Sequence, residues 1–67
     1  MPVVRVSWFD GKSREMKEKV ASEITESIVR HTGTDAGFIY VIFEDVALSN
    51  WARKGKLFGE PAADSKA

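Results

Sequence analysis

Pro2 stands directly behind Met1, and this placement offers acid-base chemistry that no ordinary side chain provides. Removal of Met1 would leave a mature chain that begins with a secondary amine, whose ring nitrogen can take and return a proton. An α-amine titrates near about 7.7 to 8.0 in water, and burial or nearby cations lower the pKa of such a group. Arg5, Lys12 and Arg53 are candidate cations. Proline is also common at this position in chains without a catalytic role, so its context decides between the two interpretations.

Metal chemistry has little support in the sequence. The chain has one histidine, His31, and no cysteine, which leaves neither a set of metal ligands nor a disulfide framework. His31 has a simpler interpretation as a cation in the last turn of a helix, where it complements the negative end of the helix dipole. We therefore expect no metal, and we assign His31 to the helix end rather than to catalysis.

The elements that must position Pro2 begin with a strand. Residues 3–9 alternate in strand period, so that Val4, Val6 and Trp8 share one face and the residues between them share the other. Asp-Gly at positions 10 and 11 predicts a turn after this strand.

A helix is predicted next, with Ser13 as its N-cap and Gly33 in the left-handed position after its last turn. Its apolar residues form a stripe that would lie on a sheet, at positions 16, 20, 21, 24 and 28. Its other faces carry three charge pairs at i, i+4 spacing, namely Arg14/Glu18, Lys19/Glu23 and Glu26/Arg30.

Residues 38–44, Phe-Ile-Tyr-Val-Ile-Phe-Glu, predict an interior strand. A strand, a helix and a second strand form a β-α-β unit, in which the strands are parallel and the connection is right-handed. Residues 45–59 then read as a turn followed by a short strand or hairpin. We expect an α/β fold with one domain at residues 1–60 and a frayed, flexible tail at residues 61–67.

Length and composition narrow the class of protein. A 67-residue chain buries only about 60% of its unfolded surface, and two strands with one helix are not stable alone, so we expect self-association. Ten basic residues balance ten acidic ones, which argues against nucleic acid as a partner. No apolar run is long enough to span a membrane, and the first ten residues do not resemble a signal peptide, so we expect a cytoplasmic protein.

Each of these sequence features is common alone, but their order and spacing in so short a chain are specific. The chain begins Met-Pro, carries Asp-Gly-Lys-Ser before an amphipathic helix, and follows a β-branched strand with Asn-Trp-Ala-Arg-Lys-Gly at residues 50–55. In this it resembles the 4-oxalocrotonate tautomerase family. The resemblance implies a catalytic amino-terminal proline without a cofactor, and a β-α-β protomer. It also implies dimers with a four-stranded sheet, commonly assembled as a homo-hexamer that is a trimer of dimers.

The resemblance also assigns further site residues, with two departures from the family. Lys12 falls where the family has an arginine that contacts a substrate carboxylate or carbonyl, and Tyr40 falls where well-studied members have a second arginine. Lysine keeps the charge without the bidentate fork, whereas tyrosine keeps only a hydrogen-bond donor. Trp51 matches an aromatic that walls the pocket, and Arg53 or Lys54 is a candidate to restore the missing charge.

The sequence therefore predicts an isomerase that interconverts keto and enol forms of a small unsaturated 2-keto or enol carboxylate, with Pro2 as general acid-base. One alternative is a non-catalytic or accessory subunit of a mixed hexamer. Another is a promiscuous member with decarboxylase or weak hydratase activity. A plain peptide- or ligand-binding module is the interpretation if Met1 is retained, and a hydrolytic dehalogenase is disfavoured because no carboxylate follows Trp51 until Glu60.

Overall fold

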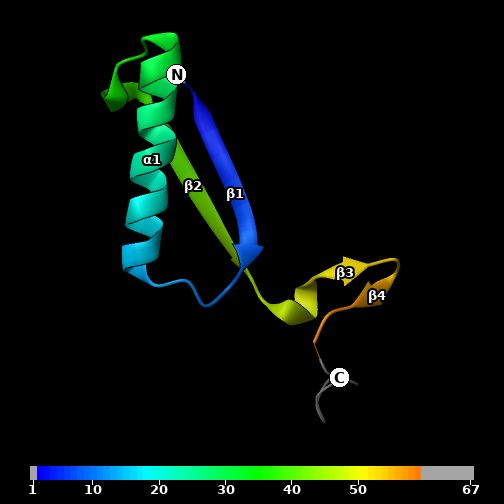
Figure 1. The fold of residues 1–67 in the computed structure, drawn as a ribbon. Helices are drawn as coiled ribbons and strands as arrows, with labels where there is room; N and C mark the ends of the chain where they lie inside the picture. The colour runs from blue at the N-terminus through cyan, green and yellow to red at the C-terminus, as the bar shows by residue number, and fades with distance from the viewer. Residues whose placement is uncertain (1, 60–67) are drawn as a thin grey trace.

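The computed structural model describes residues 2–59, and their elements follow the predicted order (Figure 1). They are β1 (Val3–Phe9), α1 (Arg14–Thr32), β2 (Tyr40–Val46), and a small hairpin of β3 (Ala52–Arg53) and β4 (Lys56–Leu57). Two 3-10 turns, η1 (Ala36–Phe38) and η2 (Leu48–Asn50), lie before and after β2. Met1 and the predicted tail at residues 61–67 lie outside the described residues.

Strands β1 and β2 form a parallel ladder, which confirms the predicted β-α-β unit. The register runs from Val3 opposite Tyr40 to Phe9 opposite Val46. One backbone hydrogen bond extends the ladder at each end, from the Tyr40 amide to the Pro2 carbonyl at 3.0 Å and from the Asp10 amide to the Val46 carbonyl at 3.1 Å. The ladder therefore includes the residue that precedes β1.

The boundaries predicted for the second strand, residues 38–44, are wrong by two residues at each end. The Asp35 side chain accepts a hydrogen bond from the Gly37 amide at 3.0 Å, and this cap holds residues 36–38 in a turn. Phe38 is therefore outside the strand, despite its β propensity. At the other end, the strand continues through Asp45 and Val46.

Both predicted helix ends are confirmed. The Ser13 hydroxyl accepts from the Met16 amide at 3.2 Å, and Gly33 adopts φ 77° and donates to the Val29 carbonyl at 2.9 Å. Two predicted charge pairs form, Arg14 with Glu18 and Glu26 with Arg30. The third prediction is wrong, because Lys19 pairs with Glu15 at 3.5 Å, where glutamate precedes lysine in the more favourable order.

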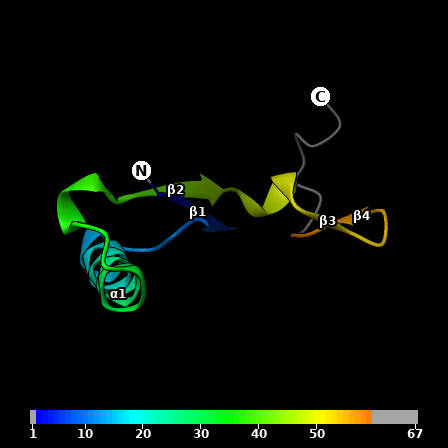
Figure 2. The same cartoon turned by 90° about the horizontal axis from the view of Figure 1, so that it is seen from above.

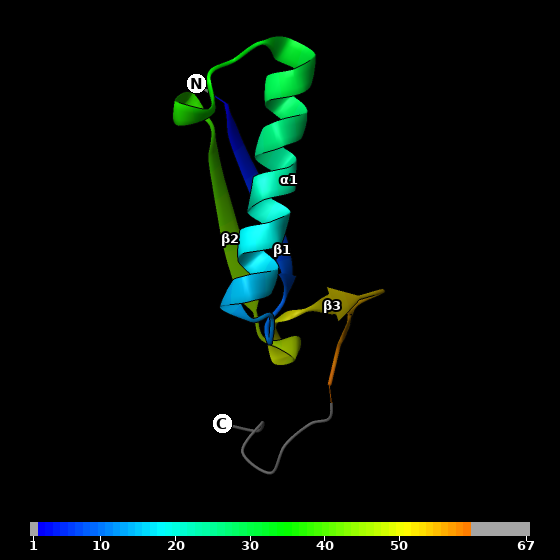
Figure 3. The same cartoon turned by 60° about the vertical axis from the view of Figure 1, so that its left-hand side comes forward.

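Helix α1 covers one face of the two-stranded sheet and leaves the other open (Figures 2 and 3). The covered face carries the half-buried Val4, Val6, Trp8, Val41 and Phe43. Most of the predicted apolar stripe packs against this face, but Met16 is 55% exposed, which corrects its assignment. Lys17 takes the place nearest the sheet in this turn, because it forms an ion pair with Asp45 of β2.

The open face is largely apolar for a surface. Val3, Phe9, Tyr40 and Ile42 are exposed on it, each by more than a third of its area. Among residues 2–59, no side chain is fully buried. A domain without a buried side chain gains little from the hydrophobic effect, so this face agrees with the expectation that another subunit covers it.

The segment after β2 forms the hairpin that the sequence allowed for. Lys54 and Gly55 have consecutive positive φ angles of 55° and 81°, the conformation of a two-residue hairpin turn. The hairpin projects beyond the ends of β1 and β2 (Figure 1). Within the part of the chain that the structure describes, no helix has both the length and the apolar character needed to cross a membrane.

Candidate active site

Pro2 is held by its carbonyl at the start of β1. The Tyr40 amide donates to the Pro2 carbonyl, so the backbone of residue 2 is fixed by the parallel ladder. The proline ring is half-buried. Proline has no amide hydrogen to offer a ladder, so the nitrogen on the other side of this residue takes no part in the sheet.

Tyr40 is the predicted site residue that the structure places beside Pro2. It begins β2 opposite Val3, and its side chain is 51% exposed. The neighbouring Val41 belongs to the face under the helix, so Tyr40 belongs to the open face. Pro2 and Tyr40 thus lie at one end of the sheet.

Lys12 lies at the opposite end, in the turn between β1 and α1. Gly11 precedes it with φ 104°, a backbone conformation that favours glycine. The Lys12 ammonium donates to the Phe9 carbonyl at 3.0 Å and lies 5.0 Å from the centre of the Trp8 ring. The turn therefore directs the Lys12 side chain back over the end of β1.

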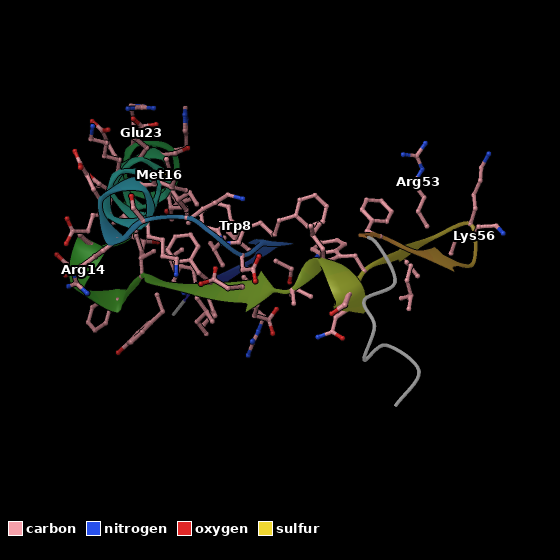
Figure 4. All side chains as sticks on the ribbon, turned by 90° about the horizontal axis from the view of Figure 1, so that it is seen from below. Trp8, Arg14, Met16, Glu23, Arg53 and Lys56 are labelled. Carbon is pink, nitrogen blue, oxygen red and sulfur yellow. The ribbon has the colours of Figure 1, made fainter. Side chains whose placement is uncertain are left out.

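Trp51 and Arg53 lie near the same end as Lys12. The Trp51 indole donates to the Val46 carbonyl at 3.1 Å, and its ring meets Phe9 with centroids 4.9 Å apart. Phe58 also contacts Phe9, at 5.7 Å. Arg53 lies on the projecting hairpin directly opposite Lys56, and both are remote from the helix residues Met16 and Glu23 (Figure 4).

The five predicted site residues therefore form two groups within one chain. Pro2 and Tyr40 lie before β1 and at the start of β2, whereas Lys12, Trp51 and Arg53 follow the other ends of these strands. A strand of seven residues is about 23 Å long, at roughly 3.3 Å per residue. A single protomer does not bring the two groups into one site.

Sequence reasoning missed a polar cluster under the helix. The Asp45 carboxylate accepts from the Trp8 indole at 2.7 Å and from the Lys17 ammonium at 2.5 Å. These two hydrogen bonds, chiefly the one from Lys17, hold the pKa of Asp45 below its usual range. The alternation of the strand could have indicated this cluster. Asp45 follows Val41 and Phe43 at every second position, so it lies on the face that the helix covers.

No metal-binding cluster of three or more histidine, cysteine or carboxylate residues occurs within residues 2–59. The predicted site residues offer cations, a hydroxyl group and aromatic side chains, and removal of Met1 would add the amine of Pro2. Proton transfer and electrostatic stabilisation of an oxyanion need no more than these groups.

Comparison with known proteins decides the family. A family model described as tautomerase enzyme matches residues 2–60. The chain belongs to the tautomerase family. A probable tautomerase of Ralstonia nicotianae is 63% identical over 60 residues, which cover 90% of this chain and 92% of that relative. A probable tautomerase of Streptococcus pneumoniae is 35% identical over 57 residues, covering 85% and 95% of the two chains.

Solved structures of tautomerase homologues share the fold. A crystal structure of a 4-oxalocrotonate tautomerase homologue superimposes with a TM-score of 0.81 at 31% identity, over 87% of this chain and 92% of that one. A heterohexameric 4-oxalocrotonate tautomerase from Chloroflexus aurantiacus gives a TM-score of 0.77 at 19% identity, over 85% and 92% of the chains. The predicted tautomerase fold is therefore confirmed.

Proposed function

We propose that this tautomerase interconverts the keto and enol forms of a small unsaturated 2-keto carboxylate, with Pro2 as its general acid-base and without a cofactor. The observation that carries the proposal is the place of Pro2, which is fixed by the ladder at the residue where the family match begins. Loss of Met1 would then present a secondary amine at a rigid position.

The proposed chemistry is a proton transfer within one substrate. The neutral nitrogen of Pro2 takes the proton of the enol hydroxyl, and the electron pair moves through the conjugated system toward carbon. The resulting ammonium returns a proton to that carbon, and the product is the keto isomer with no atom gained or lost. A cation near the oxygen stabilises the negative charge that develops there.

We propose that the site is completed by residues from more than one subunit. Pro2 and Tyr40 of one protomer would meet Lys12, Trp51 and Arg53 of neighbours, since one chain holds the two groups about 23 Å apart. The exposed apolar face beside Tyr40 supports such an assembly. We expect a homo-hexamer, with the substrate carboxylate held by Lys12 and the pocket walled by Trp51.

The test is turnover of phenylenolpyruvate and 2-hydroxymuconate by the wild-type enzyme and by Pro2→Ala. General acid-base catalysis contributes about 100- to 10,000-fold. Pro2→Ala replaces the secondary amine by a primary one after removal of Met1, so it should lose part of this factor while its circular dichroism spectrum is unchanged. Val3→Ala is the matched control, because Val3 neighbours Pro2 and carries no acid-base group. Full activity in Pro2→Ala would disprove the role of the proline.

A second experiment isolates the amine itself. A Gly-Ser extension before Pro2 leaves the ring in place and converts its nitrogen to a tertiary amide with no basicity. We expect inactivity for the extended protein and for any fraction that retains Met1 by intact mass. Activity in the extended protein would contradict the proposed mechanism even if Pro2→Ala were inactive.

The alternative proposal is an accessory subunit in a mixed hexamer. Lysine and tyrosine at positions 12 and 40 favour it, because the family commonly has arginines there, and the Chloroflexus structure is a heterohexamer. Purification of the chain alone followed by sedimentation and assay distinguishes the two. A homo-hexamer with proline-dependent turnover supports the enzyme, whereas an inactive chain that gains activity only with a second tautomerase supports the accessory role.

A further inference from the structure

We propose that Trp8 and Asp45 are positioning residues that hold the Lys12 ammonium in place for the substrate carboxylate. The inference rests on the proposed function, because Lys12 is a substrate contact only in that proposal. It concerns residues that act through Lys12 without touching substrate themselves.

The first step is the state of Lys12. Its ammonium lies against the Trp8 ring at 5.0 Å and donates one hydrogen bond, to the Phe9 carbonyl. A lysine ammonium has three hydrogens, so two remain for an incoming anion. Lysine ordinarily loses much side-chain entropy on binding a ligand, and an ammonium already held by a ring and a carbonyl loses less.

The second step is what fixes the Trp8 ring. One face of the indole stacks on Phe43 with centroids 4.9 Å apart and planes 10° apart. Its nitrogen donates to Asp45 at 2.7 Å. The ring is thus held by a face contact and an edge hydrogen bond, and it presents π density to Lys12 in a fixed orientation.

The third step is the charge around Lys12. Asp45 is the carboxylate that accepts from the Trp8 indole, and its second oxygen accepts from Lys17 at 2.5 Å. Lys17 therefore neutralises Asp45, and within residues 2–59 no carboxylate forms an ion pair with Lys12. The Lys17 hydrogen bond is the main cause of the lowered pKa of Asp45, and the longer-range charge of Lys12 is the smallest. No direct ion pair among the described residues occupies the Lys12 ammonium, which leaves it available to an anionic substrate.

The cluster can also be interpreted as packing alone, since Trp8 joins β1 to β2 and Asp45 joins β2 to α1. That interpretation predicts a loss of stability with no specific effect on Lys12. Three variants separate the two interpretations. Trp8→Phe keeps a ring under Lys12 and loses the indole hydrogen bond, Trp8→Leu loses the ring, and Asp45→Ala loses both the ion pair and the acceptor of the indole hydrogen bond.

The direct measurement is the NMR shift of the Lys12 ε-methylene protons, which does not depend on turnover. A methylene over an aromatic face is shifted upfield by the ring current. We expect an upfield shift in the wild-type protein, a smaller shift in Trp8→Phe, whose ring lacks the hydrogen bond to Asp45, and loss of the shift in Trp8→Leu. Absence of the shift in the wild-type protein would overturn the inference whatever the enzyme activity.

The functional measurement is a kinetic double-mutant cycle with phenylenolpyruvate. Loss of a cation–π contact should raise KM about threefold to tenfold in Trp8→Leu, with kcat changed less than twofold. In a Lys12→Met background the same substitution should leave KM unchanged, because there is no ammonium left to position. Lys19→Met, at an exposed helix lysine, is the matched control and should behave as wild type.

The two proposals fail in different ways. An equal rise in KM from Trp8→Leu with and without Lys12 would show that Trp8 acts by packing, and would overturn this inference while the role of Pro2 stood. Asp45→Ala, which removes the acceptor of the indole hydrogen bond, provides a second route if Trp8→Leu does not fold: a smaller upfield shift with a raised KM supports positioning, and wild-type values of both overturn it. Activity in the protein with the Gly-Ser extension would instead disprove the proposed catalytic mechanism, and the Lys12 shift would remain a test of the geometry.

Discussion

Trp51 and Phe9 form an edge-to-face aromatic pair, with 4.9 Å between ring centroids and 72° between ring planes. Phe9 ends β1, whereas Trp51 belongs to the segment after β2, so this contact ties the C-terminal hairpin to the end of the parallel ladder. The same indole donates to the Val46 carbonyl, the last residue of β2. One side chain thus fixes the hairpin to both strands.

Replacement of Trp51 should therefore weaken the fold in two separable steps. Trp51→Phe keeps the aromatic contact and loses the hydrogen bond, which should lower the free energy of unfolding by about 0.5–1.5 kcal/mol. Trp51→Leu also loses the aromatic pair, which should cost about 0.5–1.5 kcal/mol more. Urea unfolding at one fixed protein concentration measures both. Equal losses in the two variants would show that the ring contact with Phe9 contributes nothing.

The contacts of Asp45 predict that the protein loses stability at low pH. Hydrogen bonds from Lys17 and Trp8 lower the pKa of its carboxyl in the folded protein, relative to the ordinary 3.8. A carboxyl with a lowered folded pKa stabilises the fold above its unfolded pKa, and this contribution is lost as the pH falls through the folded value. The urea concentration at the unfolding midpoint should therefore fall as the pH drops below about 4. In Asp45→Asn this decrease should be smaller. An equal loss of stability at low pH in Asp45→Asn would show that other carboxyl groups cause it.

The Ser13 cap predicts a local stability effect. Ser13→Ala removes the hydrogen bond to the Met16 amide and should lower the free energy of unfolding by about 1 kcal/mol. Ser22→Ala is the control, because Ser22 is exposed within the helix and alanine has the higher helix propensity there. Thermal unfolding followed by circular dichroism compares the two. A loss as large in Ser22→Ala as in Ser13→Ala would argue against capping as the cause.

Substitution of Tyr40 should change which substrates the enzyme prefers. Tyr40→Arg would add a cation on the exposed face beside Pro2, and a charged hydrogen bond is worth about 1.5–3 kcal/mol. We expect kcat/KM for 2-hydroxymuconate, a dicarboxylate, to rise about tenfold or more, with a smaller gain for phenylenolpyruvate. Tyr40→Phe tests the hydroxyl group, and unchanged activity there would limit Tyr40 to packing. No gain in Tyr40→Arg would show that position 40 does not face the substrate.

Local patterns predicted the elements well, because each depended on neighbours in sequence. Ser13 and Gly33 are set by backbone chemistry within one helical turn, and the alternation of residues 3–9 follows from the pleat of a strand. The predictions that failed depended on competition between neighbours. Phe38 has high β propensity, but the Asp35 cap captures its segment in a turn.

The site was harder to predict because its residues are not neighbours in one chain. Sequence reasoning found the amine at Pro2 and the cation at Lys12, and the strand predicted between them already separates the two, but no spacing pattern shows which residues would lie beside each of them. Trp8 was assigned to a strand face, and its contacts with Lys12 and Asp45 depend on the β1–α1 turn and on a residue thirty-seven positions away. Tertiary contacts of this kind leave no local signal.

The register of the ladder has a consequence for how the chain folds. Every pair from Val3 with Tyr40 to Phe9 with Val46 joins residues thirty-seven positions apart, so no short hairpin can nucleate this sheet. Closing so long a loop costs entropy before any ladder bond forms, and a helix forms within about a microsecond, well ahead of it. Formation of α1 first shortens the chain segment between β1 and β2. The rate at which the two strands pair is therefore set by a helix that contributes nothing to their hydrogen bonds.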